Sequence, residues 1–319
     1  MRPRPARNVP SGTAAAVLLA TTLATALAAC SAAPPSAGGA GSRDAAPMPV
    51  AASFYPLQFA AEQVGGHHVQ VTGLTKAGVE PHDLELTPKD VAAVSSARVV
   101  VYAKGFQPAV DAAVAQQAGD AGLDVAPVAR LDLPSPSAEA GAVAPSGPDP
   151  HFWLDPQRYA QVATAIGARF ATADPAHSAD YATNTKAFVE ALTTLDTQLR
   201  QGTASCQTKE LVTSHAAFGY LSQRYGFTQV AIAGLSPDTE PSAAKLAEVA
   251  DYVRAHGITT IYAETLVEPA FAETVAKSTG ATVATLDPVE GLTDRSAGKD
   301  YLEVMRANLT ALRAGQRCQ

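Results

Sequence analysis

Cysteine and long apolar runs are scarce in this sequence. Only three cysteines occur among 319 residues, too few for the dense disulfide framework that stabilises small secreted domains. Beyond residue 29, no stretch approaches the roughly 18–20 uninterrupted apolar residues of a transmembrane helix. Any membrane attachment is therefore expected at the N-terminus alone.

Basic residues are also few. The chain has 30 acidic and 23 basic residues, which gives a net charge of −7. Three of the basic residues, Arg2, Arg4 and Arg7, lie in the first 29 positions, so the rest of the chain carries −10. This balance disfavours nucleic acid as a partner and is compatible with a cationic ligand.

Two motifs that indicate enzymatic chemistry are missing. The sequence contains no GxxxxGK[ST], the loop that cradles nucleotide phosphates. It also contains no HExxH, which places two zinc ligands and a general base on one helix. A zinc hydrolase therefore stays the least favoured alternative, and we expect that the protein is not an enzyme.

The first 29 residues have the layout of an export signal. The three arginines precede an uncharged apolar run from Ala14 to Ala29. This run closes on LAAC, Leu27 to Cys30, which resembles the lipobox of bacterial lipoproteins, where the chain is cut before a cysteine that receives lipid. We expect a signal peptide over 1–29, lipidation of Cys30 and a flexible tether over 30–48, with an ordinary secretory signal as the alternative. The protein is then exported and lipid-anchored at the extracytoplasmic face of the membrane, or in a periplasm.

The two remaining cysteines are Cys206 and Cys318. An exported location permits their oxidation. Cys206 precedes a predicted strand, and Cys318 is next to last in the chain. We predict a disulfide that holds the C-terminus, with two unrelated small apolar residues as the alternative.

Short β-rich runs alternate with helical segments along the rest of the chain, a pattern that predicts parallel sheets covered by helices. At roughly 100–200 residues per domain, the chain beyond the tether predicts two lobes. The segment from Pro175 to about Leu199 has no interior proline or glycine, and we interpret it as a rigid connector helix. The predicted parts are an N-terminal lobe over 49–173, the connector over 174–203 and a C-terminal lobe over 204–319. The β-rich runs are Val50–Phe54, His68–Leu74, Ala97–Ala103, Glu210–His215, Thr228–Gly234, Ile258–Glu264 and Ala281–Asp287.

Four side chains capable of binding a metal lie near the ends of predicted strands. They are His82, His151, His215 and Asp287, two in each lobe. In parallel α/β sheets, ligands bind beyond the carboxyl ends of the strands. Three imidazoles and one carboxylate suit zinc. Each residue also has a structural alternative, as a loop, packing, capping or turn residue, and it is their joint placement that favours a metal site between the lobes.

The other four histidines do not share this placement. His67 and His68 precede a strand, His177 lies at the start of the connector helix and His256 lies at a helix end. We interpret these four as structural or surface residues.

Five stretches carry recognisable motifs: EPHDLELTPKD, DPHFWLDP, VTSHAAFGYLSQRYG, GLSPDTEPS and LDPVEGL. Together they resemble the metal-binding receptors of zinc and manganese ABC importers, the group with a rigid helix between two lobes. This resemblance implies a (β/α) lobe on each side of the helix, a buried metal between them and, as partners, a membrane permease with a separate ATPase. We expect a monomer. A histidine at the third ligand position, His215, favours zinc, with a manganese or broad-specificity receptor and a metal-dependent adhesin as alternatives.

The sequence departs from that family in one segment. Leu131 to Pro150 is proline-rich and contains no histidine, whereas many zinc receptors carry a histidine-rich loop there. We predict an exposed loop without a metal-scavenging role. Some members complete the site with water or a different carboxylate, so those alternatives to Asp287 stay open.

Overall fold

The computed structural model describes residues 46–135 and 147–319. The predicted signal peptide, Cys30 and most of the tether lie outside the described residues, as does the centre of the segment from Leu131 to Pro150. Within the described ranges, no helix is both long and apolar enough to cross a bilayer.

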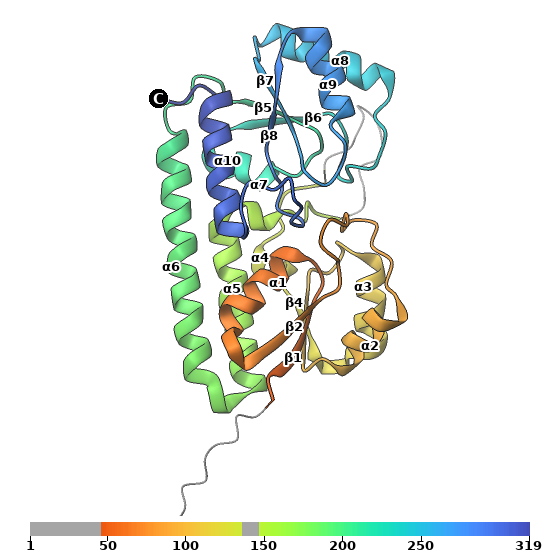
Figure 1. Cartoon of the computed structure of the whole chain (residues 1–319), viewed down its shortest axis with the longest axis vertical. Helices are drawn as coiled ribbons and strands as arrows, with labels where there is room; N and C mark the ends of the chain where they lie inside the picture. The colour runs from red at the N-terminus through yellow and green to blue at the C-terminus, as the bar shows by residue number, and fades with distance from the viewer. Residues whose placement is uncertain (1–45, 136–146) are drawn as a thin grey trace, which may run out of the picture. The chain divides into compact units, whose positions relative to one another are not determined.

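The first half of the fold is built on a parallel sheet with the strand order β2-β1-β3-β4 (Figure 1). Its central strands are apolar and buried, as expected for a parallel sheet covered on both faces. The strands are β1 Met48–Ala52, β2 Val69–Gly73, β3 Val99–Tyr102 and β4 Gly122–Asp124. The helices are α1 Tyr55–Gly65, α2 Pro88–Ser96, α3 Pro108–Ala113, α4 Ala126–Ala129 and α5 Pro156–Ala173.

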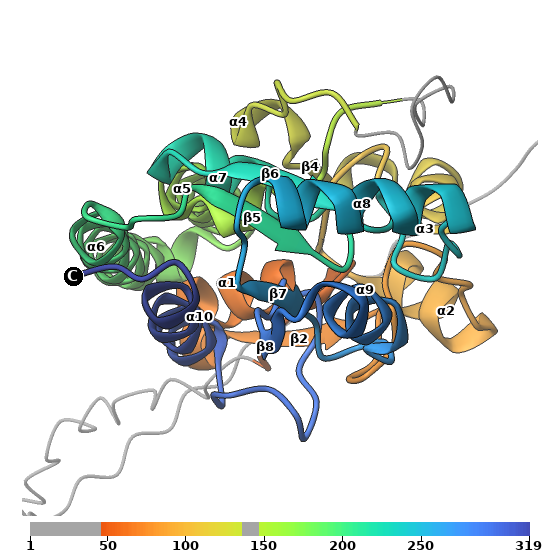
Figure 2. The same cartoon turned by 90° about the horizontal axis from the view of Figure 1, so that it is seen from above.

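The second half repeats this plan, with a parallel sheet in the order β6-β5-β7-β8. Helices α8 and α9 lie side by side on one face of this sheet, where Val249 and Val253 of α8 share an apolar cluster with Val275 of α9 (Figure 2). Helix α8 ends just before Gly257, whose φ of 61° is in the left-handed region that glycine adopts at low cost. The strands are β5 Glu210–Thr213, β6 Thr228–Ala231, β7 Thr260–Ala263 and β8 Thr282–Thr285. The helices are α7 Gly219–Tyr225, α8 Ala243–Ala255, α9 Ala270–Thr279 and α10 Tyr301–Gly315.

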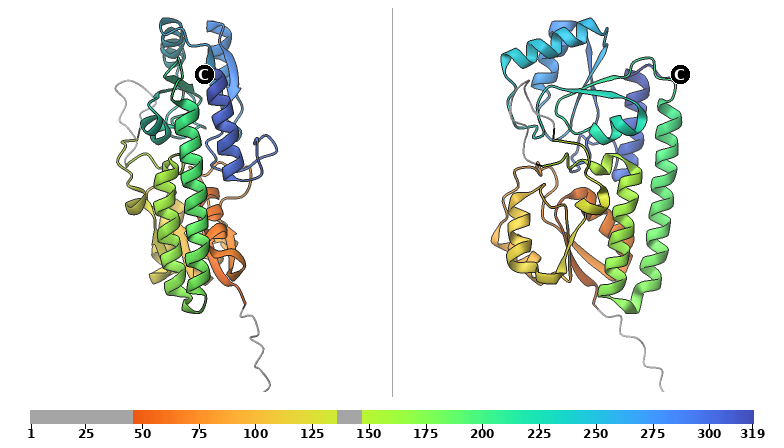
Figure 3. Two further views of the ribbon diagram at one scale, coloured as in Figure 1. Left: turned by 90° about the vertical axis from the view of Figure 1, so that its left-hand side faces the viewer. Right: turned by 180° about the vertical axis from the view of Figure 1, so that it is seen from behind.

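One long helix, α6 Ser178–Thr203, links the two halves. It packs against α5 and α1 of the first half and against α10 and α7 of the second, and it runs alongside both halves in Figures 1 and 3. Its inward stripe includes Tyr181, Phe188, Leu192 and Leu195. The predicted α/β class, with two parallel sheets and one long connecting helix, is therefore confirmed, while the predicted boundaries of the lobes stay a prediction.

Aromatic side chains join the two halves into one hydrophobic core. Phe59 of α1 lies with its ring centroid 5.6 Å from that of Phe188 in α6 and 6.0 Å from that of Tyr301 in α10. Tyr159 of α5 lies 4.7 Å from Tyr301. Because these rings are buried, a wide separation of the halves exposes apolar surface and costs free energy.

A disulfide connects Cys206, just after α6, with Cys318, just after α10. The predicted pairing is confirmed. The bond closes a loop with a sequence separation of 112 residues, which includes the whole second sheet. It therefore fixes the end of the chain to the end of the connecting helix.

Each predicted β-rich run overlaps one strand of the two sheets, but no run was predicted for β4. This strand has three residues, of which Leu123 alone is a bulky apolar residue. A run this short at a sheet edge gives no periodic pattern. The prediction of an exposed loop from Leu131 to Pro150 holds for part of its described ends, where Asp132, Pro134, Gly147 and Pro148 are exposed. It is wrong for Ser135 and Asp149, which are buried.

Candidate metal centre

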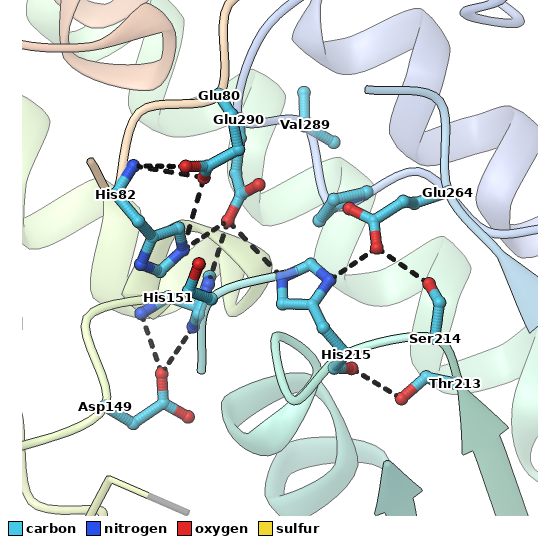
Figure 4. A network of polar contacts seen from close by, with 12 residues as sticks. Glu80, His82, Asp149, His151, Thr213, Ser214, His215, Glu264, Val289 and Glu290 are labelled. Atoms are coloured by element: carbon cyan, nitrogen blue, oxygen red, sulfur yellow. Dashed lines mark hydrogen bonds and ion pairs between the residues drawn. The ribbon is translucent and has the colours of Figure 1, made fainter. Parts of the chain in front are cut away.

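Four buried side chains meet at one point between the two sheets. The ligand atoms of His82, His151, His215 and Glu290 all lie within 4.8 Å of one another (Figure 4). His82 follows β2 and His215 follows β5, whereas His151 precedes α5 and Glu290 follows β8. Each half of the fold thus supplies two of the four side chains. The structure brings the three predicted histidines together and adds a glutamate.

The histidines converge on one oxygen atom. Glu290 Oε1 lies 3.1 Å from His82 Nε2, 2.9 Å from His151 Nε2 and 3.6 Å from His215 Nε2. Glu290 and His151 are fully buried, and His215 is 1% exposed. Among the described residues, His215 Nε2 and Glu290 Oε2 have no hydrogen-bond partner. Buried polar atoms without partners are costly, so their placement here indicates a function.

Two carboxylates orient the rings of His151 and His215. His151 Nδ1 donates to Asp149 Oδ1 at 2.7 Å, and His215 Nδ1 donates to Glu264 Oε1 at 2.7 Å. Since an ionised carboxylate only accepts, both Nδ1 atoms carry a proton. The Nε2 atoms are then the ones available to a cation, which is the usual arrangement around a metal-bound histidine.

The third histidine, His82, is held through its main chain. Its N–H donates to both oxygens of Glu80, at 3.0 and 2.9 Å, and its ring meets Phe106 edge to face at a centroid distance of 4.8 Å. The neighbouring acid Asp83 accepts from Ser236 Oγ at 3.4 Å. Glu80 therefore positions His82 through the main chain, and its Oε1 also lies 3.8 Å from the ring Nε2.

The expected fourth ligand, Asp287, is not part of this group. Its Oδ1 accepts from the N–H of Val289 at 2.8 Å, and its Oδ2 accepts from Ser296 Oγ at 2.9 Å and Thr265 Oγ1 at 3.1 Å. These bonds commit the carboxylate to the turn after β8. Asp287 thus shapes the turn that carries Glu290, and Glu290 occupies the position predicted for Asp287.

This turn has an unusual backbone conformation. Val289 has a φ of 58°, and its side chain is fully buried. A β-branched residue in the left-handed region is strained, so the surrounding contacts must hold it there. The sharp turn aims Glu290 back between the two halves.

The buried charges shift the ionisation of the centre. Burial lowers the pKa of His82, and the neighbouring imidazoles act in the same direction. Burial opposes protonation of His151 and His215 too, but Asp149 and Glu264 respectively outweigh it, so the pKa of each is raised. Burial disfavours the charge of Glu290, yet the adjacent histidines, His151 most of all, hold its pKa well below its usual range. Protons therefore compete with a cation for the same nitrogen atoms.

The other histidines lie away from the centre. His68 stacks on His177 at a centroid distance of 4.0 Å, and their ring nitrogens contact Asp180 and Asp174. His256 is exposed and stacks on Tyr252 at 4.0 Å.

Sequence reasoning missed three residues of the centre. Glu290 lies in the quoted motif LDPVEGL, three positions after the aspartate that was chosen. Asp149 lies two residues before His151, and Glu264 is the last residue of the predicted run Ile258–Glu264. For Asp149, the sequence signal was a DPH tripeptide, in which an acid can accept from the ring two residues later.

Comparison with known proteins gives a consistent family. The profile described as zinc-uptake complex component A, periplasmic (ZnuA), matches residues 50–315. The high-affinity zinc uptake system protein ZnuA of Bacillus subtilis is 34% identical over 277 residues, covering 83% of this chain and 86% of that protein. The zinc-binding lipoprotein AdcA of Streptococcus pneumoniae is 35% identical over 283 residues, covering 83% of this chain and 55% of that protein. This chain therefore spans about half the length of AdcA.

Solved structures agree with this result. The laminin-binding protein Lmb of Streptococcus agalactiae, described as bifunctional with adhesin and metal-transporting activity, has a TM-score of 0.74 at 32% identity, with 85% of this chain and 99% of that chain covered. Zn(II)-bound AdcA from Streptococcus pneumoniae has a TM-score of 0.71 at 34% identity, with 85% of this chain and 58% of that chain covered.

Proposed function

This chain belongs to the ZnuA family of periplasmic zinc-uptake components, and from that premise we propose that it captures one zinc ion outside the cytoplasm and delivers it to an ABC importer. The proposed ligands are the Nε2 atoms of the three converging histidines together with the carboxylate of Glu290. Glu290 replaces Asp287 in the set expected from the sequence.

One observation carries this proposal, the spacing of the ligand atoms. In tetrahedral zinc sites the Zn–N and Zn–O bonds are ~2.0–2.1 Å, which separates neighbouring ligand atoms by roughly 3.4 Å. The three nitrogen-to-oxygen distances of 3.1, 2.9 and 3.6 Å lie around this value. The side chains therefore need only small shifts to surround a zinc ion.

The donor set supports zinc over manganese. Three imidazoles and one carboxylate suit a borderline ion, whereas manganese prefers oxygen ligands. The third position is the discriminating one, because His215 offers nitrogen there. Competition between zinc and manganese for the purified protein tests this preference directly.

The same geometry supports a receptor over a catalyst. A catalytic zinc keeps one open position for water or substrate. Here four protein side chains fill a tetrahedron inside the fold, and Glu290 and His151 have no exposed surface. A fully enclosed ion is suited to capture and transfer.

Transfer requires partners that this chain does not contain. We propose a membrane permease driven by a separate ATPase as the recipient, and a monomeric receptor anchored through lipid on Cys30 at the extracytoplasmic face. The proposal of an anchor is supported by the LAAC motif and by the name of the pneumococcal relative, a zinc-binding lipoprotein. Mass spectrometry of the N-terminal peptide from native membranes tests it.

The central experiment is a zinc titration of the purified protein against a chelator of known affinity. We expect one zinc per chain. Replacement of His82, His151 or His215 by alanine weakens binding by at least about 100-fold, because each removes a ligand and opens a buried cavity.

The matched control is His256→Ala, which removes an exposed imidazole that lies at the end of α8. This control leaves the affinity unchanged. If all three ligand variants bind zinc as tightly as the control, the proposed site is wrong.

A further inference from the structure

The loop that carries His151 belongs to the first half of the fold but is held by the second. Tyr220 of α7 donates its hydroxyl to the main-chain oxygen of Asp149 at 2.9 Å. Two residues beyond His151, Trp153 donates its indole N–H to the main-chain oxygen of Pro288 at 2.7 Å. Hydrogen bonds from the second half thus hold this loop on both sides of His151.

Asp149 is the residue through which one of these contacts reaches the metal ligand. Its Oδ1 accepts from the main-chain N–H of His151 at 2.9 Å and from the ring Nδ1 at 2.7 Å. The Asp149 side chain is 3% exposed. The position of Asp149 therefore determines how the His151 ring is presented.

The first residue of α7, Gly219, leaves room for this carboxylate. A β-carbon added at Gly219 would lie 2.6 Å from Asp149 Oδ2 and 3.3 Å from a methyl group of Leu133. The first distance is shorter than any ordinary contact. Any side chain at this position must displace Asp149 or α7, so the absence of a β-carbon allows the close approach.

Tyr220 is itself fixed from the first half. Its ring is fully buried, and the guanidinium carbon of Arg158 in α5 lies 4.5 Å above its centroid. Replacing Tyr220 by phenylalanine keeps this cation–π contact and the packing and removes the hydroxyl alone.

We propose that Gly219 and Tyr220 are positioning residues that form a clamp on Asp149. The clamp orients the His151 ring for the ion as long as α7 and the His151 loop stay in contact. Movement of α7 away from this loop releases Asp149, frees the ring and speeds dissociation of the ion. The clamp thereby couples contact between the two halves to release. This inference rests on the proposed function, because it concerns the same zinc site.

The test compares zinc dissociation rates, measured by transfer to an excess of chelator, in Tyr220→Phe and Gly219→Ala. We expect dissociation to be about 3–10-fold faster in the first variant and about 10–100-fold faster in the second, the range found when a partner that orients a metal ligand is lost. The matched control is Tyr225→Phe, which removes a hydroxyl from the same helix, where it donates to Asp196 at 3.0 Å. The control dissociates at the wild-type rate.

A double-mutant cycle separates clamping from general damage to the fold. In an Asp149→Ala background the added methyl group of Gly219→Ala no longer meets a carboxylate. We expect Gly219→Ala to have a much smaller effect there, because only the 3.3 Å approach to Leu133 remains. If it speeds dissociation equally in both backgrounds, it does not act through Asp149 and the clamp is refuted.

A readout without zinc distinguishes failure of the clamp from failure of the proposed function. Long-range ¹H–¹⁵N spectra of the zinc-free protein report the protonation of His151 Nδ1, and we expect Tyr220→Phe to change this signal whereas Tyr225→Phe does not. An unchanged signal, with unchanged dissociation, overturns the clamp even where wild-type zinc binding is intact. Absence of zinc binding by the wild type refutes the proposed function, and the spectra still decide the clamp.

Discussion

Replacement of Glu290 by glutamine tests the fourth ligand. The carboxylate is fully buried, and its ion-pair contacts are with the three histidines. With three neutral imidazoles, Glu290 leaves a bound Zn²⁺ centre at +1, whereas glutamine leaves it at +2. Loss of one partner from a buried charge pair costs about 3–5 kcal/mol, and each 1.4 kcal/mol is about tenfold in affinity. We expect Glu290→Gln to weaken zinc binding by roughly 10²-fold to several times 10³-fold.

The informative comparison is Asp287→Asn, which changes the other candidate in the same turn. Asparagine keeps one oxygen that can accept from the Val289 N–H, now at 2.8 Å. We expect the altered hydrogen bonds to lower the free energy of unfolding by about 1–2 kcal/mol. Zinc affinity falls only about tenfold, because the turn still presents Glu290 to the ion.

Competition titration with a chromogenic chelator measures both dissociation constants, and thermal unfolding of the zinc-free proteins measures stability. A Glu290→Gln variant within threefold of wild type indicates that water completes the site. If Asp287→Asn lowers zinc affinity more than Glu290→Gln does, Asp287 is the fourth ligand, as the sequence predicted. Either result refutes the geometry argued above.

Three further predictions concern protons and covalent structure. Zinc affinity falls as pH drops, because protons compete with the ion for the histidine nitrogens. The pKa values of His151 and His215 are raised, so the loss of affinity begins at a pH above the usual imidazole pKa of ~6.5. Zinc titrations at a series of pH values between acidic and neutral measure this loss. Arg224 and Arg200 outweigh the effect of burial and lower the pKa of Asp196 to about 2, so its contribution to stability is present above the unfolded pKa of ~3.9 and is lost as pH falls through 2. Asp196→Asn therefore lowers the free energy of unfolding by about 1–2 kcal/mol at neutral pH. The value is modest because Arg200 is 61% exposed and solvent screens the ion pair. Denaturant unfolding of both proteins at neutral and acidic pH measures the loss and its dependence on pH. Reduction of the disulfide, which spans 112 residues, lowers the free energy of unfolding by about 2–4 kcal/mol without loss of the zinc site; an unchanged unfolding midpoint in reductant contradicts this.

The parallel α/β architecture could be predicted because its signals are local. Apolar runs such as the one containing β3 are separated by helical segments, and Gly257 marks the end of α8. The connecting helix was recognisable because no proline or glycine interrupts the segment from Pro175 to Leu199. β4 was not predictable, since its three residues pair with β3 through the main chain and need no apolar pattern of their own.

The histidines of the centre were easier to predict than its acids. The chain has seven histidines and 30 acidic residues, so a histidine after a strand is a rarer event than a carboxylate there. Asp287 and Glu290 both follow β8 within a few residues, and only the backbone of the turn decides which of them points inward. That decision depends on the positive φ of Val289, which no local propensity predicts for a β-branched residue.

Release of a fully enclosed ion needs movement, and the structure restricts which parts can move. The aromatic core and α6 join both halves, so a wide opening is costly. The ligands, in contrast, lie on loops and turns whose positions depend on a few contacts. Tyr220 and Trp153 hold the His151 loop, and a strained turn carries Glu290. If the clamp acts as proposed, a small displacement of these contacts moves the proposed ligands away from the ion without separating the core, and the proposed permease can trigger release by binding near α7.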